Sequence, residues 1–175
     1  MIARRQSSKA KRSTATSPRQ PTLLPCKDLT MAGKFLIDVT DARFKIAVND
    51  DVMHFVRIAN PSAHTDIGIR LLELCKELPG VGAYSPSYKS CAYVVLHTAA
   101  HRIFAIAYGQ RGLAFCVPPA AQAEALADDG APATEIGPDW VSFVPYDEAG
   151  QAGARERLRR WCSVAYVAAG ASRSC

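Results

Sequence analysis

The sequence contains no closely spaced pair of cysteines, the usual mark of a zinc site or a redox motif. No two of its six cysteines lie within four residues of each other, and no apolar leader is evident in the first 30 residues. Four cysteines fall inside apolar periodic segments: Cys75, Cys91, Cys116 and Cys162. This spacing favours buried free thiols in a reducing compartment over a disulfide framework, so we expect a cytoplasmic protein.

Long apolar runs and the common catalytic motifs are also missing. No run approaches the roughly 20 apolar residues of a membrane helix, so we expect no membrane partner. There is no Gly-x-Ser-x-Gly, no phosphate-binding loop and no Gly-x-Gly-x-x-Gly, and neither Cys91 nor Cys116 has the local signature of a nucleophile. The sequence therefore predicts no catalytic residues, no cofactor and no enzymatic activity.

Acidic residues are absent from the first 27 positions. Those positions carry seven basic residues: Arg4, Arg5, Lys9, Lys11, Arg12, Arg19 and Lys27. The whole chain has 21 basic and 16 acidic residues, so subtracting those seven leaves 14 basic against 16 acidic and a net charge of −2. A phosphate backbone repels the remaining body on average, and nucleic-acid binding by the body therefore requires a local basic patch.

Residues 1–30 are rich in Ser, Thr, Arg, Lys and Pro and poor in large apolar side chains. Such a segment cannot bury enough apolar surface to offset its ordering entropy, so we expect a disordered basic tail. Three interpretations stay open: a solubilising tail or over-extended gene start, a basic arm that touches nucleic acid, and an organelle transit peptide. Met31 and Met53 are alternative starts, so the sequence leaves open whether residues 1–52 belong to the native product.

Residues 31–61 form an extension whose status the sequence does not decide. Three short segments in it read as strands, KFLIDV, RFKIAV and VMHFVRI, with TDA and NDD as turns. Val52, His54, Val56 and Ile58 follow one another at the two-residue period of a strand. We therefore expect short strands between residues 34 and 58.

Residues 62–170 predict one domain, followed by a C-terminal tail at residues 171–175. The first element is a helix, because its apolar residues share one stripe at helical spacing. The stripe consists of Ile67, Leu71, Leu74, Cys75 and Leu78. The Pro-Gly pair after the stripe ends the helix, and the following stretch VGAYSPSYKS reads as a loop.

Three strand-like runs follow, CAYVVLH, RIFAIAY and LAFCVP, joined by the short connections TAAH and GQRG. Such connections predict hairpins, with Gly109 and Gly112 supplying positive φ in the second turn. A helix led by Pro118 or Pro119, a fourth strand WVSFVPY and a last helix over about 150–169 complete the order. The predicted class is α+β, a small antiparallel sheet of about four strands packed with three helices.

The segment HTAAHRIF places His97 and His101 four residues apart. This spacing brings two imidazoles to one side of a helix, but here it straddles a hairpin turn. A zinc site also needs a third and usually a fourth protein ligand, which no nearby motif supplies. We therefore predict an exposed hairpin tip and no metal.

Basic residues outside the tail cluster in two places. Lys89, Arg102 and Arg111 stand at or beside strand ends near tyrosines, where they either enter a nucleic-acid groove or protect strand edges. In the segment ARERLRR, Arg155 and Arg159 form either a phosphate-facing stripe or part of a solvated helix face. We take Lys89, Arg102 and Arg111 as the candidate DNA contacts, with phosphate contacts from Arg155 and Arg159.

Five segments, LLELCKELPGV, HRIFAIA, GLAFCVPPAAQAEAL, DWVSFVPYD and LRRWCSVAYVAA, occur in this order over about 100 residues. They include a helix ending in Leu-Pro-Gly, a His-Arg-Ile-Phe step, a strand running into a Pro-led helix, and a Trp-Val strand. In this order and spacing the stretch resembles the MmcQ/YjbR-like family of small bacterial domains. The resemblance implies a compact α+β fold, described as a double-wing arrangement, and DNA binding.

The leading hypothesis is therefore a non-enzymatic, DNA-binding domain of the MmcQ/YjbR type. The alternative belongs to another class, a small-molecule or protein-interaction module with no nucleic-acid role that uses the sheet face or the loop at residues 82–90. The sequence indicates no base preference, no particular protein partner and no oligomeric state.

Overall fold

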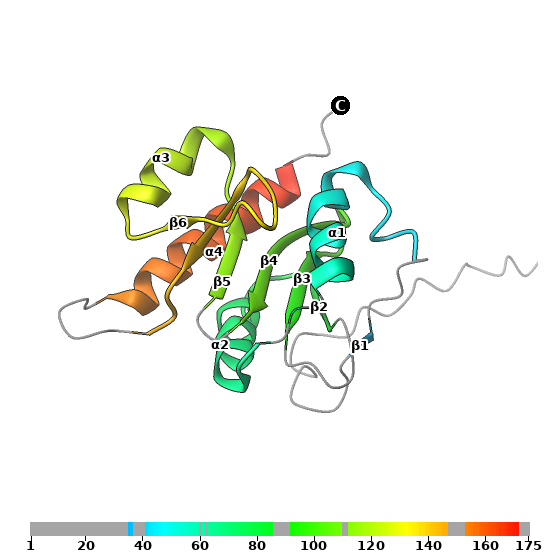
Figure 1. The fold of residues 1–175 in the computed structure, drawn as a ribbon, viewed down its shortest axis with the longest axis horizontal. Helices are drawn as coiled ribbons and strands as arrows, with labels where there is room; N and C mark the ends of the chain where they lie inside the picture. The colour runs from blue at the N-terminus through cyan, green and yellow to red at the C-terminus, as the bar shows by residue number, and fades with distance from the viewer. Residues whose placement is uncertain are drawn as a thin grey trace, which may run out of the picture.

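The described strands build one sheet, and the helices pack around it (Figure 1). The computed structural model describes residues 35–36, 41–59, 61, 63–85, 92–109, 112–146 and 153–171. Its elements are β1 (Phe35–Leu36), the 3-10 helix η2 (Ala47–Asn49), α1 (Asp50–Ala59), α2 (Thr65–Cys75), β2 (Val81–Ser85), β3 (Tyr93–His97), β4 (Arg102–Tyr108), β5 (Gly112–Cys116), α3 (Pro119–Ala127), β6 (Ala131–Pro132), β7 (Trp140–Phe143) and α4 (Ala154–Ala171). The tails predicted at residues 1–30 and 171–175 lie outside the described residues, apart from the last residue of α4.

The described strands form one seven-stranded sheet in the order β1-β2-β3-β4-β5-β7-β6. Neighbours from β2 to β6 pair antiparallel, and β1 pairs parallel to β2. The predicted α+β class and antiparallel pairing are therefore confirmed. The predicted number of elements in the domain was too small, because β2, β6 and α1 add to the four strands and three helices expected, and β1 of the extension joins the same sheet.

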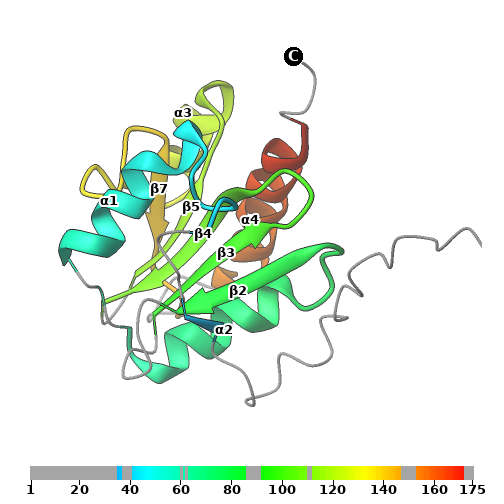
Figure 2. The same cartoon turned by 90° about the vertical axis from the view of Figure 1, so that its right-hand side faces the viewer.

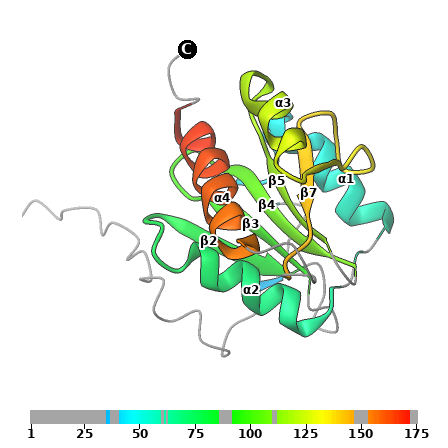
Figure 3. The same cartoon turned by 90° about the vertical axis from the view of Figure 1, so that its left-hand side faces the viewer.

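Helices cover both faces of the sheet. On one face, called here the α4 face, α2 and α4 pack side chains such as Leu71 and Trp161 against Phe115. On the other, the α1 face, Val52 of α1 packs with Ile106 of β4. Figures 2 and 3 show α1 and α4 on opposite sides of the sheet. No described helix has the length and apolar character needed to cross a bilayer.

The two covered faces explain the nearly continuous apolar runs of the central strands. In β3, Val94 belongs to the α1 face and its neighbour Val95 to the α4 face, and both are fully buried. In β4 the pairing with β3 skips Phe104, which is the extra residue of a β-bulge. A strand buried on both faces loses the polar alternation that marks a half-exposed strand.

Of the three short strands predicted between residues 34 and 58, the second and third were wrong. Phe35 and Leu36 do pair as β1, but residues 43–48 form turns and the start of η2, and the segment VMHFVRI lies in α1. Val52 and Val56 are four residues apart and share one buried helix face, whereas Ile58 is 70% exposed. Two acids in the first turn of α1, Asp50 and Asp51, suit the positive end of a helix dipole.

β2 was predicted as a loop and is a strand. Its sequence VGAYS contains Gly82, which weakens the strand signal because glycine has low β-propensity. A Cβ at Gly82 would come within 3.0 Å of the Tyr84 ring, so the glycine gives that ring room. In the second hairpin Gly109 has the predicted positive φ of 63°, whereas Gly112 is not among the positive-φ glycines.

A small polar cluster holds the segment before α1 against β2. The single Nε–H of Arg43 is shared between the two oxygens of the Asp41 carboxylate, at 3.1 and 2.9 Å, and Nη1 donates to the Tyr84 hydroxyl at 2.6 Å. The hydrogen bonds from Arg43 lower the pKa of Asp41 to about 2. Phe44 packs edge-on against Tyr84 with ring centroids 5.1 Å apart, so Phe44 belongs to the core on the α1 face.

Asn49 is fully buried, and its side chain hydrogen-bonds to two backbone groups at the β3–β4 turn. Its Nδ2 donates to the carbonyl of His101 at 2.7 Å, and its Oδ1 accepts from the amide of Ile103 at 2.9 Å. These two hydrogen bonds join η2 to the β3–β4 hairpin, more than 50 residues further along the chain.

We expect Asn49→Ala to destabilise the fold by about 2–3 kcal/mol, because it leaves a buried amide and a carbonyl without partners. Val48→Ala is the matched control, since Val48 is 48% exposed and its change should stay within about 0.5 kcal/mol. Urea unfolding of the two variants measures the difference. Equal losses of unfolding free energy would contradict this role for Asn49.

Candidate functional site

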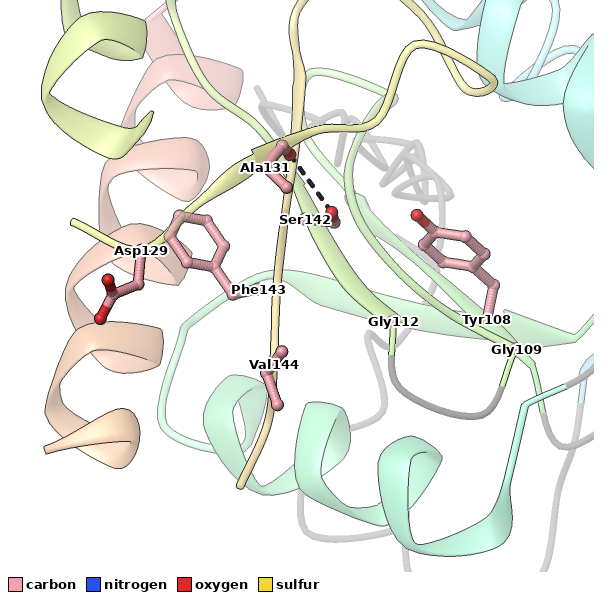
Figure 4. A pocket seen from close by; sticks show the side chains of 8 residues that line it. All are labelled: Tyr108, Gly109, Gly112, Asp129, Ala131, Ser142, Phe143 and Val144. Carbon is pink, nitrogen blue, oxygen red and sulfur yellow. Dashed lines mark hydrogen bonds between the residues drawn. The ribbon is translucent and has the colours of Figure 1, made fainter. Parts of the chain in front are cut away.

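An open hollow of about 290 Å³ lies where the β4–β5 hairpin ends beside β7 and β6 (Figure 4). It is lined by Tyr108, Gly109, Gly112, Asp129, Ala131, Ser142, Phe143 and Val144. These residues come from the ends of four strands and from the turn that follows α3. The hollow therefore depends on the sheet for its walls, and it is close to the smallest size typical of ligand sites.

Strand geometry divides the lining between the two faces of the sheet. Successive side chains of a strand point to opposite sides, so Ser142 and Phe143 of β7 diverge. Figure 4 shows Tyr108 and Ser142 on one side of β7, with Asp129 and Phe143 on the other. Tyr108 packs edge-on against Phe55 of α1, with ring centroids 5.6 Å apart. The polar part of the hollow is therefore on the α1 face.

The hydroxyl protons of this polar part are already used within the protein. Tyr108 donates its proton to Glu135 Oε1 at 2.8 Å, and Ser142 donates to the carbonyl of Ala131 at 3.2 Å. Burial, and then the bond to the Glu135 carboxylate, raise the pKa of Tyr108 far above its ordinary value, although a hydrogen bond with the Ser142 hydroxyl acts in the opposite sense. Each hydroxyl oxygen can still accept from an incoming donor, although the Ser142 hydroxyl already contacts the Tyr108 oxygen. The hollow is therefore lined by hydrogen-bond acceptors.

The far wall of the hollow is fixed to α4 by ion pairs. Arg157 reaches Asp128 at 3.4 Å and Asp129 at 3.0 Å, and Trp161 Nε1 donates to Asp128 at 2.8 Å. Asp129 adopts a left-handed φ of 58°, which aspartate tolerates better than most residues. The carboxylate of Asp129 is thus turned to Arg157 and away from Tyr108.

Arg160 extends this network along α4. Its guanidinium pairs with Glu124 of α3 and with Asp128 at 3.6 Å, and it lies 4.9 Å from the centre of the Trp161 ring. Two of the four arginines in ARERLRR therefore hold α3 and the following turn onto α4. These partners could not be predicted from the sequence, since they lie 29 and 36 residues away.

The predicted DNA contacts lie in different parts of the fold. Arg155 and Arg159 are exposed on α4, and Arg159 pairs with Glu156 at 3.4 Å. Arg102 is half-buried at the start of β4, and its Nη2 lies 3.8 Å from Cys116 Sγ, on the α1 face. The structure brings Arg155 and Arg159 together on α4 and leaves Arg102 apart from them. Lys89 and Arg111 lie outside the described residues.

The two histidines flank the β3–β4 turn, as the spacing predicted, but both are half-buried. His97 accepts a bond from the Ala100 amide at 3.2 Å and packs on Tyr166 of α4, with ring centroids 5.1 Å apart. His101 has a left-handed φ of 55° and offers its carbonyl to Asn49. Within the described ranges no three His, Cys, Asp or Glu side chains gather as they would around a metal ion.

Comparison of the chain with models of protein families, with curated protein sequences and with solved structures found no match. The resemblance to the MmcQ/YjbR-like family therefore stays a prediction.

Tyr108 should stay neutral in the folded chain below about pH 11, because its pKa is raised. We therefore expect folded Tyr108→Phe and folded wild type to gain the same phenolate absorbance up to that pH. A pKa raised in the folded state stabilises the fold below the unfolded value near 10, and that stability is lost as pH rises further. The wild type should therefore lose stability more steeply than Tyr108→Phe above about pH 10.

The measurement is a spectrophotometric titration of both chains, folded and in urea. In urea the variant should lack the absorbance of one of the six tyrosines. A folded variant whose absorbance is already smaller by that amount below pH 11 would show that Tyr108 titrates normally.

Proposed function

We propose that the chain is a binding module that holds the N–H donor group of a small organic molecule, such as a primary amine, in the hollow beside Tyr108 and Ser142. The observation that carries the proposal is the commitment of both hydroxyl protons to protein acceptors. A ligand that enters must therefore offer donors. The Glu135 carboxylate, which accepts from Tyr108, favours a cationic donor over a neutral one.

The chemistry of the described side chains supports binding and not catalysis. Tyr108 is a neutral phenol because its pKa is raised, so it is not available as a base at neutral pH. Burial also raises the pKa of Cys116, although Arg102 acts in the opposite sense, so the thiol is a poor nucleophile. Neither group has the activated state that covalent or acid–base catalysis requires.

We expect butylamine to shift the backbone amide resonances of Gly109 and Gly112 in an NMR titration, with butyrate as the matched anion. Glu135→Gln should weaken butylamine binding about tenfold, because a hydrogen bond to a charged group contributes about 1.5–3 kcal/mol. Ser142→Ala should weaken it by about fivefold or less, because a neutral hydrogen bond contributes less.

Glu156→Gln on α4 is the control for a change of one negative charge, because Glu156 is exposed and pairs with Arg159 outside the hollow. It should leave the affinity unchanged. Equal shifts with butyrate, or equal losses of affinity in Glu135→Gln and Glu156→Gln, would contradict the proposed site.

A second candidate function is DNA binding, which the resemblance to the MmcQ/YjbR-like family implies. One observation favours it: Arg155 and Arg159 are both exposed and lie four residues apart, on neighbouring turns of α4. Such a pair can contact two phosphates of a DNA backbone. Against it, Arg159 already pairs with Glu156. Arg160 pairs with α3 and Arg157 with the turn after it, so most of the arginines of α4 are already paired.

If α4 binds DNA, the double variant Arg155→Ala and Arg159→Ala should have a shallower plot of log K against log salt concentration. The magnitude of the slope should fall by about two, because each phosphate contact contributes about one unit. Arg70→Ala in α2, combined with Lys76→Ala directly after it, is the matched control and should leave the slope unchanged. The measurement is fluorescence anisotropy of a labelled duplex at several salt concentrations.

A chain in which the seven basic residues before Asp28 are changed to Gln separates the tail from the domain. Binding that disappears in this chain and persists in the α4 variant would assign DNA binding to the tail and contradict a role for α4.

A further inference from the structure

Two cysteines from different helices meet in the core on the α4 face. Cys75 is the last residue of α2 and Cys162 lies in α4, and their Sγ atoms are 3.8 Å apart. Both side chains are buried, with 2% and 1% exposure. The two residues are 87 positions apart in the chain, so only the folded state brings the sulfurs together.

Helical spacing explains why both sulfurs face the same interior. Cys75 follows Ile67 and Leu71 at intervals of four along α2, and all three are buried against the sheet. Cys162 lies four residues after Leu158 in the buried stripe of α4. The two stripes converge on the same face of the sheet, and the thiols occupy the place where they touch.

The sulfurs are close enough to bond after a small movement. A disulfide needs a separation of about 2.05 Å, so the sulfurs have to approach by about 1.8 Å from the 3.8 Å between them. Rotation of the two side chains supplies part of this approach. Cys75 ends α2, and beyond it the Leu78 amide donates to the Cys75 carbonyl at 3.0 Å, so opening of this last turn supplies the rest.

We propose that Cys75 and Cys162 are a redox-active thiol pair, which a hydroperoxide oxidises to a disulfide that cross-links α2 to α4. With hydrogen peroxide, one thiolate attacks an oxygen and breaks the O–O bond, giving a sulfenic acid and, with one proton, water. The second thiol attacks the sulfenic sulfur and displaces a second water, so two thiols are oxidised and one peroxide is reduced.

Burial sets the selectivity of the step. Sulfurs with this exposure react only when α2 opens locally, so a small oxidant reaches them and bulky disulfides react more slowly. The product closes a loop that contains most of the sheet and α3, which restricts the unfolded chain. The cross-link also fixes α4, whose Arg157 holds Asp128 and Asp129 beside the hollow.

Cys116 provides a control within the same chain. It is buried as well, but it lies on the α1 face, and its Sγ accepts from Arg102. Burial raises the pKa of its thiol. No described cysteine shares its cluster, so we expect Cys116 to form no cross-link to Cys75 or Cys162 in the folded protein.

The test is peptide mapping of the full native chain after exposure to hydrogen peroxide and blocking of free thiols. Trypsin cleaves after Arg70, Lys76, Arg160 and Arg173, so residues 71–76 and 161–173 are released as peptides with one cysteine each. We expect one linked species of these two peptides. We also expect oxidation to raise the thermal midpoint by about 5–10 °C, and a reductant to reverse the shift.

Cys116→Ala should retain both the linked species and the reversible shift, whereas Cys75→Ala and Cys162→Ala should each lose both. The mapping of the wild-type chain decides the proposal even if these two variants fold poorly. Recovery of both wild-type peptides as blocked thiols, or as sulfinic acids without a link, would overturn it. A link of either peptide to another cysteine would overturn it as well.

Discussion

The central strands β3 and β4 have to be covered on both faces, and the rest of the structure follows from that need. Val94 and Val95 are neighbours in sequence, point to opposite faces and are both fully buried. One layer of helices cannot bury both. Residues 41–59 therefore pack as a second layer, and this layer places Phe55 against Tyr108, which sets one wall of the hollow.

The charges of α4 show how a basic segment can serve the fold. Arg157 and Arg160 are held by acids from α3 and the turn after it, and Trp161 shares one of those acids. Partly buried, networked pairs of this kind contribute more than isolated surface pairs. Positive charge that looks available in the sequence is therefore mostly neutralised on α4, while the hollow presents the hydroxyl oxygens of Tyr108 and Ser142.

Long periodic patterns were predicted well from the sequence, and short or ambiguous ones were not. The stripes of α2 and α4 and the hairpins from β3 to β5 have repeats long enough to exclude other structures. Val52, His54 and Val56 fit a strand and a helix equally, because positions two apart alternate in a strand while positions four apart share a helix face. Whether such a segment becomes helix or strand depends on which of its side chains pack against the sheet, and this is decided by tertiary structure.

The candidate site was largely outside the reach of sequence reasoning. Ser142 is a lone polar residue in the apolar segment WVSFV, and that contrast was the one signal available. Glu135 lies in a turn-rich stretch where an acidic residue is common and carries no functional signal. It nevertheless accepts a hydrogen bond from Tyr108, 27 residues earlier. Pairs such as these, or the two thiols of α2 and α4, become visible only once the strands are in register.

The edge of the sheet at β6 disfavours association between copies of the chain at high concentration. β6 has two residues, both exposed, and the second is Pro132, which has no amide proton to donate. An approaching strand from another molecule would find too few partners there to extend the ladder. This rim is thus protected against the edge-to-edge association from which aggregates grow.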